Sequence, residues 1–123
     1  MTLVIGGAGQ GKLALTLRTL GLDPAQAGGS PEENPPVLNH LETWLKTQPD
    51  PLPALEAYLT RRPDAVILCD EVGCGVVPMD RSDRDWRERV GRTCCALAER
   101  ADLVIRVYCG IPTVLKGDGT LWN

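Results

Sequence analysis

The chain has 123 residues, 43% of them hydrophobic, and carries a formal net charge of −3. This length predicts a single domain, residues 1–123, that buries a core without disulfides or a structural metal. The mixed charges contain no basic stripe for nucleic acid, and no apolar run approaches the ~20 residues that span a bilayer. No basic segment precedes the first apolar residues, as a signal peptide would require, so we expect a cytoplasmic protein.

The first predicted strand, residues 2–5, leads into a glycine-rich turn that fits the phosphate-binding pattern G-x-x-x-x-G-K. Glycines let backbone N–H groups converge on an anion at the positive end of the following helix, and Lys12 adds a charge at the β- and γ-phosphates. The alternative is an ordinary strand-to-helix turn with a surface lysine, but the strand–loop–helix context favours phosphate binding. The predicted nucleotide contacts are Gly6, Gly7, Ala8, Gly9, Gln10, Gly11, Lys12 and Leu13.

The pattern normally ends in Ser or Thr, whose hydroxyl touches magnesium, and this chain has Leu13 there. A helix is predicted over residues 12–20, with Leu13, Leu17 and Leu20 on one face and Gly21 as its stop. Residues 21–36 are rich in Gly, Pro and Ala and are expected to form a loop, either a functional flap or a mobile segment.

Two short helices are predicted in the middle of the chain. The first is amphipathic and spans residues 37–48, where the apolar stripe is Val37, Leu38, Leu41, Trp44 and Leu45. The second begins at about Pro53, because proline is favourable in a first helical turn. Its expected buried residues are Leu52, Leu55, Tyr58 and Leu59.

Residues 64–70 form a continuous apolar run that ends in Asp70, as expected of a buried parallel strand with its carboxylate at the carboxyl edge. Asp70 is the predicted residue for orienting Mg²⁺, and Glu71 is a candidate base or substrate contact. The alternative is that both acids cap the next turn. A glycine-punctuated loop follows at 71–78.

A long helix is predicted next, begun by a capping box of Ser82 with Asp85. Trp86, Val90, Cys94, Leu97 and Ala101 follow it at helical spacing. Residues 102–109 are the third predicted strand, and residues 110–112 are expected to turn the chain. Residues 116–119 are expected to close a small terminal hairpin. Five cysteines without a C-x-x-C pair predict reduced thiols, with Cys69 and Cys109 in the core.

Strands that alternate with helices predict an α/β fold, a mostly parallel sheet with helices on both faces. Ligands of such sheets bind beyond the carboxyl ends of the strands. Residues 6–12 and 70–75 both follow strands, so the phosphate loop and the acidic strand end are expected to meet in one site.

The glycine loop and the segment E-V-G-C-G-V-V-P at Glu71–Pro78 resemble motifs of the bifunctional adenosylcobinamide kinase / adenosylcobinamide-phosphate guanylyltransferase family of cobalamin biosynthesis. The resemblance covers residues 1–20 and 64–117. It implies a P-loop nucleotide-binding fold, ATP or GTP as donor, Mg²⁺, a corrinoid substrate that resembles adenosylcobinamide, and homo-oligomeric assembly. Lys12, Asp70 and Glu71 are then the expected catalytic residues.

The chain departs from that family in its middle part as well as at Leu13. Family members are longer and carry, after the first helix, a strand and a helix with the histidine that becomes guanylylated, whereas here the middle is compressed into residues 21–63. His40 is the chain's one histidine and hence the only candidate nucleotidyl acceptor of that type. A lone histidine on an amphipathic helix is more often a surface residue.

Three functional hypotheses follow from these residues. The first is a kinase-type phosphotransferase that uses ATP or GTP on a cobinamide-type alcohol, based on Lys12 with Asp70 and Glu71. The second is a nucleotide-binding or regulatory module of the same family without catalysis, based on Leu13 and the compressed middle. A purely structural partner subunit is the third.

Overall fold

The computed structural model describes residues 1–72 and 80–123. In this part of the chain, one sheet has the strand order β2-β3-β4-β1-β5-β6. The strands are β1 (Thr2–Gly6), β2 (Ala27–Gly28), β3 (Val37–Leu38), β4 (Val66–Asp70), β5 (Leu103–Tyr108) and β6 (Ile111–Lys116). The helices are α1 (Lys12–Leu20), α2 (Leu41–Trp44), α3 (Leu52–Arg61) and α4 (Arg81–Arg100), with short 3₁₀ turns at Pro24–Gln26, Pro31–Glu33, Leu45–Thr47 and Thr120–Trp122.

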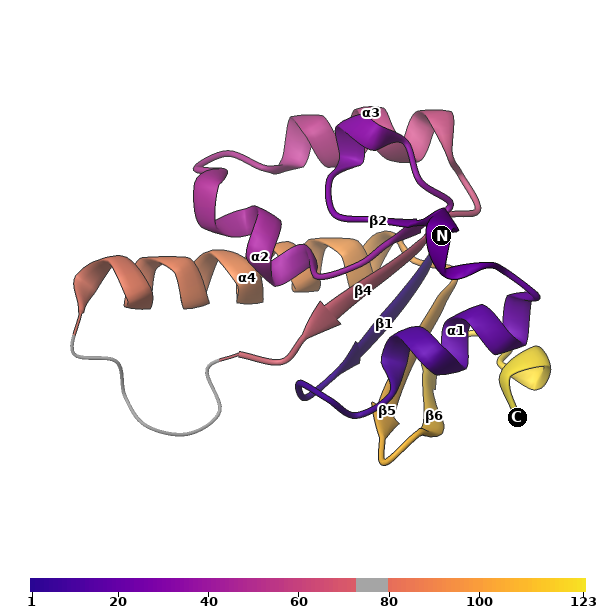
Figure 1. Cartoon of the computed structure of the whole chain (residues 1–123). Helices are drawn as coiled ribbons and strands as arrows, with labels where there is room; N and C mark the ends of the chain where they lie inside the picture. Colours follow the sequence, from indigo (N-terminus) through magenta and orange to yellow (C-terminus); the bar gives the residue numbers. More distant parts are fainter. Residues whose placement is uncertain (73–79) are drawn as a thin grey trace.

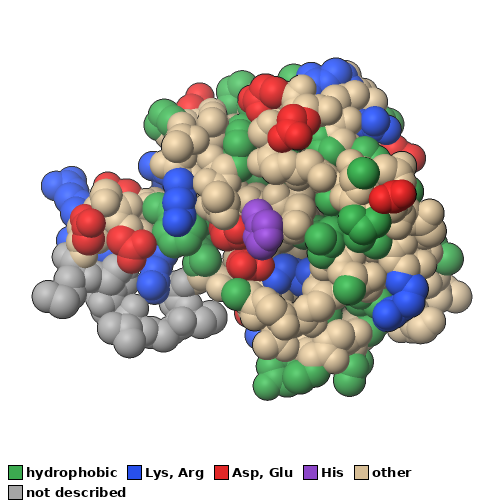
Figure 2. Space-filling model, viewed as in Figure 1, with side chains coloured by type: hydrophobic (Ala, Val, Ile, Leu, Met, Phe, Trp, Pro, Cys, Tyr) green, Lys and Arg blue, Asp and Glu red, His purple; other side chains and the backbone are tan. Residues whose placement is uncertain are grey.

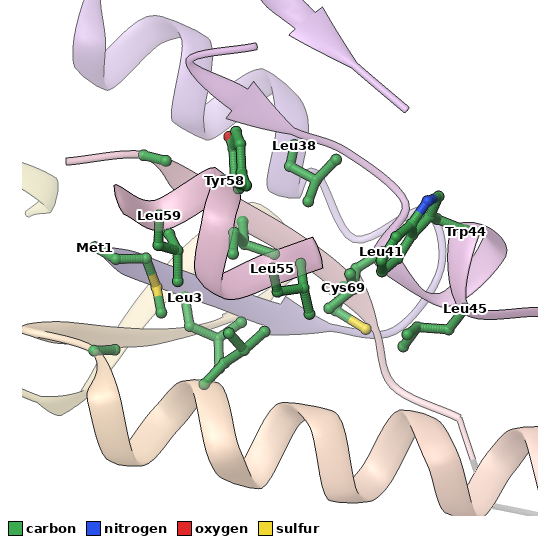
Figure 3. Close-up of a cluster of buried hydrophobic side chains, with 14 of the residues drawn as sticks. Met1, Leu3, Leu38, Leu41, Trp44, Leu45, Leu55, Tyr58, Leu59 and Cys69 are labelled. Carbon is green, nitrogen blue, oxygen red and sulfur yellow. The ribbon is translucent and has the colours of Figure 1, made fainter. Parts of the chain in front are cut away.

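Helices cover both faces of the sheet, as the sequence predicts (Figure 1). On one face α2, α3 and α4 pack on Leu3 and on its strand partners Ile67 and Val104. Figure 3 shows Leu3 within this cluster. On the other face Leu15 of α1 packs in a cluster with Val4 and the alternate residues of the neighbouring strands. Successive strand residues point to opposite faces, so nearly every residue of β1 and β4 needs an apolar side chain.

Strand β1 lies at the centre of the sheet, parallel to both β4 and β5. Its last residue, Gly6, pairs with Asp70 of β4, and a Cβ added at Gly6 would lie 2.4 Å from the carbonyl oxygen of Val107. Glycine is therefore required where the backbones approach this closely. The phosphate loop and the acidic end of β4 consequently leave the sheet side by side.

The middle of the chain differs from its prediction. Residues 21–36 contain strand β2 and two 3₁₀ turns rather than a structureless flap, and Val37 and Leu38 form strand β3 rather than a helical stripe. Backbone pairing with β4 overrides the helical spacing there, and α2 begins only at Leu41. Helix α3 buries Leu55, Tyr58 and Leu59 as expected, but Leu52 is 42% exposed.

The chain ends also differ from prediction. The chain turns near Gly110 as expected, but this turn, at Cys109 and Gly110 with their positive φ angles, is the one that closes the β5–β6 hairpin. The hairpin expected at residues 116–119 is therefore wrong. Cys109 is consequently exposed, whereas Cys69 is buried as expected.

The expected cap of the long helix is wrong. Helix α4 is capped by Asp80, whose carboxylate accepts from the Ser82 backbone N–H, rather than by Ser82. In α1, Leu13 and Leu20 of the predicted apolar face are partly buried against the cluster that contains Leu15, which is itself buried. Residues 73–79, which hold most of the E-V-G-C-G-V-V-P segment, lie outside the described residues. No helix within the described ranges is long and apolar enough to cross a membrane.

Candidate functional site

The glycine loop between β1 and α1 has the backbone geometry that its glycines allow. Gly9 and Gly11 adopt φ angles of 71° and 92°, and Gly11 directly precedes the first residue of α1. The hairpin turn supports the loop from the side, since the backbone N–H groups of Gly110 and Cys109 donate to the Gln10 backbone and side-chain oxygens at 2.8 and 2.7 Å. The N-terminal N–H groups of α1 therefore open onto a braced loop, which suits an anion.

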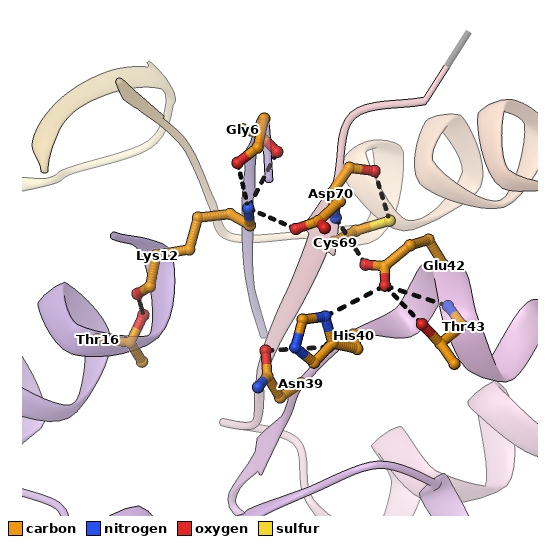
Figure 4. Close-up of polar contacts among 10 residues, drawn as sticks. Gly6, Lys12, Thr16, Asn39, His40, Glu42, Thr43, Cys69 and Asp70 are labelled. Atoms are coloured by element: carbon orange, nitrogen blue, oxygen red, sulfur yellow. Dashed lines mark hydrogen bonds and ion pairs between the residues drawn. The ribbon is translucent and has the colours of Figure 1, made fainter. Parts of the chain in front are cut away.

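Lys12 is buried, with its ammonium group at the mouth of this loop. Its Nζ donates to the carbonyl oxygens of Gly6 and Gly7 at 3.0 and 2.8 Å and lies 2.6 Å from Asp70 Oδ1 (Figure 4). The pairing brings together the two residues that the sequence singled out on separate strands. A buried lysine needs such partners, because an unpaired ammonium group would lose its hydration without compensation.

Asp70 and Glu71 point to different partners. Asp70 lines the loop cavity beside Lys12, whereas the carboxylate of Glu71 binds the Arg106 guanidinium through Nε at 2.8 Å and Nη2 at 3.1 Å. The Glu71 backbone N–H donates to the Gly6 carbonyl oxygen at 2.8 Å, which continues the β1–β4 pairing by one residue. Glu71 thus braces the carboxyl edge of the sheet next to the cavity and is not among the residues that line it.

A cavity of about 170 Å³ opens between the loop and the carboxyl ends of β3 and β4. The lining residues are Gly9, Gln10, Gly11, Lys12, Leu13, Ala14, Asn39, His40 and Asp70. Figure 2 shows the chain's one histidine at the surface, with acidic side chains (red) beside it and basic groups (blue) close by. Of the predicted residues, Gly9–Leu13, Asp70 and His40 are therefore assembled around one hollow, whereas Gly6, Gly7 and Ala8 are not among those that line it.

Leu13 lines the cavity at the sequence position where the pattern normally has Ser or Thr. The nearest hydroxyl along the helix, Thr16, is fully buried and donates to the Lys12 carbonyl oxygen at 2.8 Å. Thr16 hence does not replace the missing hydroxyl. Asp70 supplies the carboxylate oxygen that Mg²⁺ prefers, so the donor chemistry of this edge fits that ion through Asp70.

Glu42, which no sequence pattern singled out, lies next to His40 and Asp70. Glu42 is 5% exposed, and its Oε1 accepts from the Asp70 backbone N–H at 2.8 Å. Its Oε2 accepts from the backbone N–H and hydroxyl of Thr43 at 3.2 and 3.0 Å and lies 3.3 Å from His40 Nδ1. The helix predicted over 37–48 left Glu42 out of its apolar stripe, whereas the observed helix α2 begins at Leu41 and buries Glu42. The sequence carries no signal for this burial.

His40 itself has a strained backbone. It adopts φ 56° and ψ 51° immediately before α2, a left-handed conformation that is uncommon for residues other than glycine and asparagine. Its side chain is 60% exposed, and its ring points over the cavity edge toward Glu42 (Figure 4). Residues held in this way cluster at functional sites, where surrounding contacts compensate the strain.

One comparison with known proteins identifies a family. A family model described as cobinamide kinase / cobinamide phosphate guanyltransferase matches residues 37–115, well over half of the chain. The match begins after the glycine loop, so the loop is recognised by its own pattern and geometry, while His40, Glu42, Asp70 and Glu71 fall inside the matched span. No curated protein sequence matches the chain.

Proposed function

The chain belongs to the cobinamide kinase / cobinamide phosphate guanyltransferase family, and we propose that it transfers the γ-phosphoryl group of a nucleoside triphosphate to the hydroxyl of a cobinamide-type alcohol in cobalamin biosynthesis. The observation that carries the proposal is the 2.6 Å pair of Lys12 and Asp70 at the mouth of the glycine loop. A general phosphate site needs only the loop, whereas phosphoryl transfer also needs a cation and an acidic group at the γ-phosphate end.

The loop, Lys12, Asp70 and Glu71 then have distinct roles. The N–H groups of residues 6–13 bind the phosphate oxygens, and Lys12 moves from Asp70 to the β- and γ-phosphates. Asp70 would hold Mg²⁺, which neutralises phosphate charge when bound. Glu71, paired with Arg106, keeps the end of β4 in register beside the loop. Either ATP or GTP fits this description, because none of the described contacts reads a base.

The test is phosphoryl transfer from ATP or GTP to adenosylcobinamide in the presence of magnesium. Lys12→Ala should lower kcat/KM by about 10²-fold or more, since an electrostatic contact to the transferring group is lost. Lys46→Ala is the matched control, because Lys46 is exposed and lies over the Trp86 ring, with no part in lining the loop cavity. Transfer by the wild type that equals transfer by Lys12→Ala would refute the proposal.

The second candidate is a nucleotide-binding or regulatory module without catalysis, favoured by Leu13 in the cavity wall. It predicts that calorimetry detects ATP or GTP binding that depends on Lys12, while adenosylcobinamide is never phosphorylated. Guanylyl transfer, the other activity in the family description, would need His40 as acceptor, and labelling with GTP radioactive at the α-phosphate tests that role.

A further inference from the structure

A second hollow adjoins the phosphate-loop cavity and shares Asn39 and His40 with it. This hollow has a volume of about 400 Å³ and lies beyond the carboxyl ends of β2 and β3. Its wall is formed by Ala27, Gly28, Gly29, Asn39, His40 and Thr43. His40 therefore stands at the border of two spaces, one of which faces Lys12 and Asp70.

The geometry of phosphoryl transfer decides what the second hollow can hold. Lys12 and Asp70 mark the γ-phosphate end of a bound nucleotide, because the loop lysine reaches the β- and γ-phosphates. The acceptor oxygen must approach the γ-phosphorus from the side opposite to the leaving oxygen. Asn39 and His40 line both this cavity and the second hollow, so among the described residues the second hollow adjoins that end of the nucleotide and has room for an acceptor.

The contacts of His40 fix which ring nitrogen faces a ligand. Its Nδ1 lies 3.3 Å from Glu42 Oε2, and an ionised carboxylate only accepts hydrogen bonds, so Nδ1 carries the proton in this contact. Nε2 is then the nitrogen with a free lone pair. Glu42 is itself held by the Asp70 backbone N–H and by Thr43, which makes it a positioning residue for the ring.

We propose, on the basis of the proposed function, that the hollow between β2 and the His40 turn is the subsite for the acceptor alcohol and that His40 Nε2 receives the proton of the acceptor hydroxyl. In this step the hydroxyl oxygen forms a bond to the γ-phosphorus, and the bond from the γ-phosphorus to the β,γ-bridging oxygen breaks. The electron pair leaves with the nucleoside diphosphate, and the hydroxyl proton moves to Nε2. The hydroxyl-bearing arm of a corrinoid is the ligand class that we expect here.

A metal ion held by His40, Glu42 and Asp70 is the competing interpretation, since ligand atoms of all three lie within 4.8 Å of one another. The existing contacts argue against it. Both oxygens of Glu42 already accept hydrogen bonds, Oε1 from the Asp70 backbone N–H and Oε2 from the backbone N–H and the hydroxyl of Thr43. A cation would have to displace several of these donors.

The role of His40 is tested with His40→Gly, because glycine adopts the observed φ of 56° without strain and leaves space for a free imidazole. We expect kcat to fall about 10²-fold or more, with nucleotide affinity unchanged, and added imidazole to restore turnover in a saturable manner. Asn34→Gly is the matched control, since Asn34 also has a positive φ, of 54°. An unchanged kcat, a fall without imidazole rescue, or a covalent nucleotide on His40 would overturn the assignment.

The positioning role of Glu42 has its own readout. Glu42→Gln should lower kcat with little change in the KM for adenosylcobinamide, because the ring loses its orientation while the hollow keeps its shape. A merely structural role would raise KM as well. Binding of Mn²⁺ to the nucleotide-free wild type that disappears in Glu42→Gln would show a metal site and overturn the proposal.

The subsite is tested with Gly29→Leu, because a Cβ at Gly29 would meet no atom within 4 Å and the new side chain would fill the hollow. We expect adenosylcobinamide, followed by its own visible absorbance, to bind at least about tenfold more weakly, with unchanged ATP and GTP affinity. Weaker nucleotide binding instead, or unchanged corrinoid binding, would refute the subsite. This measurement needs no turnover, so its failure is distinct from a failure to transfer phosphate.

Discussion

Leu13 is the residue at which this loop departs from its pattern, and its side chain lines the cavity that the loop forms. Magnesium normally keeps several water ligands, so one more water can take the place of the missing hydroxyl. A single ligand or hydrogen bond exchanged for water changes a free energy by about 1 kcal/mol. Leu13 is therefore compatible with the proposed kinase activity, and we expect Lys12 and Asp70 to contribute more to phosphoryl transfer than the missing hydroxyl would.

Replacing Leu13 by Ser measures how well a water molecule takes the place of the missing hydroxyl. We expect phosphoryl transfer by Leu13→Ser to differ from the wild type by less than about tenfold, which corresponds to about 1.4 kcal/mol. Leu13→Ala controls for the removal of the side-chain bulk, since it opens the same space without a hydroxyl. A gain of several hundredfold in Leu13→Ser, absent from Leu13→Ala, would instead indicate a decayed enzyme.

At the scale of elements, the sheet edge near the site depends on short strands held by side-chain contacts. Strands β2 and β3 have only two residues each, and the segment before β3 is fixed by Tyr58 of α3, whose hydroxyl donates to the Pro35 carbonyl oxygen at 2.6 Å. Arg62 donates to the neighbouring Asn34 carbonyl oxygen. Helix α3 thus holds the strand that leads directly into the His40 turn.

We expect the protein to lose stability in alkaline solution as the buried Tyr58 hydroxyl ionises. Burial raises the pKa of Tyr58 to about 12 from an ordinary value of 10.0. The contribution of Tyr58 to the free energy of unfolding is fully present below pH 10, where its hydroxyl is protonated in both the folded and the unfolded state. As pH rises from 10 to 12, the free energy of unfolding falls by roughly 2–3 kcal/mol because of this group. In Tyr58→Phe we expect lower stability at pH 7 by about 1–3 kcal/mol, because the Pro35 carbonyl loses its donor, and a flatter decline above pH 10.

Urea unfolding at several pH values from 7 to 12 checks this expectation. Tyr108→Phe is the matched control, because Tyr108 is the chain's other tyrosine and is 69% exposed. Equal alkaline slopes in the wild type and Tyr58→Phe would contradict the assignment of this pH dependence to the buried hydroxyl.

At the scale of the whole molecule, one sheet carries two apolar layers, and both layers include residues from the beginning and the end of the chain. Met1 and Val104 share one layer, and Val4 and Trp122 share the other. Such interleaving supports the prediction that residues 1–123 are one domain. Assembly into a homo-oligomer stays a prediction; the exposed Tyr108, Ile111 and Leu115 near and on the edge strand β6 are compatible with it.

Calorimetry tests the single domain. We expect one thermal transition in which the calorimetric and van't Hoff enthalpies agree, with an enthalpy of about 85 kcal/mol near 60 °C from about 0.7 kcal/mol per residue over 123 residues. Two separate transitions would show that the chain contains two units.

A saturating nucleotide at 100 times its Kd should stabilise the folded state by about 2.7 kcal/mol, an effect that Lys12→Ala removes at the same concentration.

The sequence by itself determined the α/β fold, the glycine loop with Lys12, and the acidic end of β4. The spacing of the glycines is a local signal of the phosphate loop, and continuous apolar runs are a local signal of buried parallel strands. Only the tertiary structure decided that Lys12 pairs with Asp70, that Glu71 turns to Arg106, and that Glu42 reaches His40. The reason is physical: strands of two residues, such as β3, are set by pairing with distant β4 rather than by their own periodicity. The glycine loop can thus be predicted from residues 6–12 alone. The position of His40 between the loop cavity and the second hollow depends on the assembled sheet.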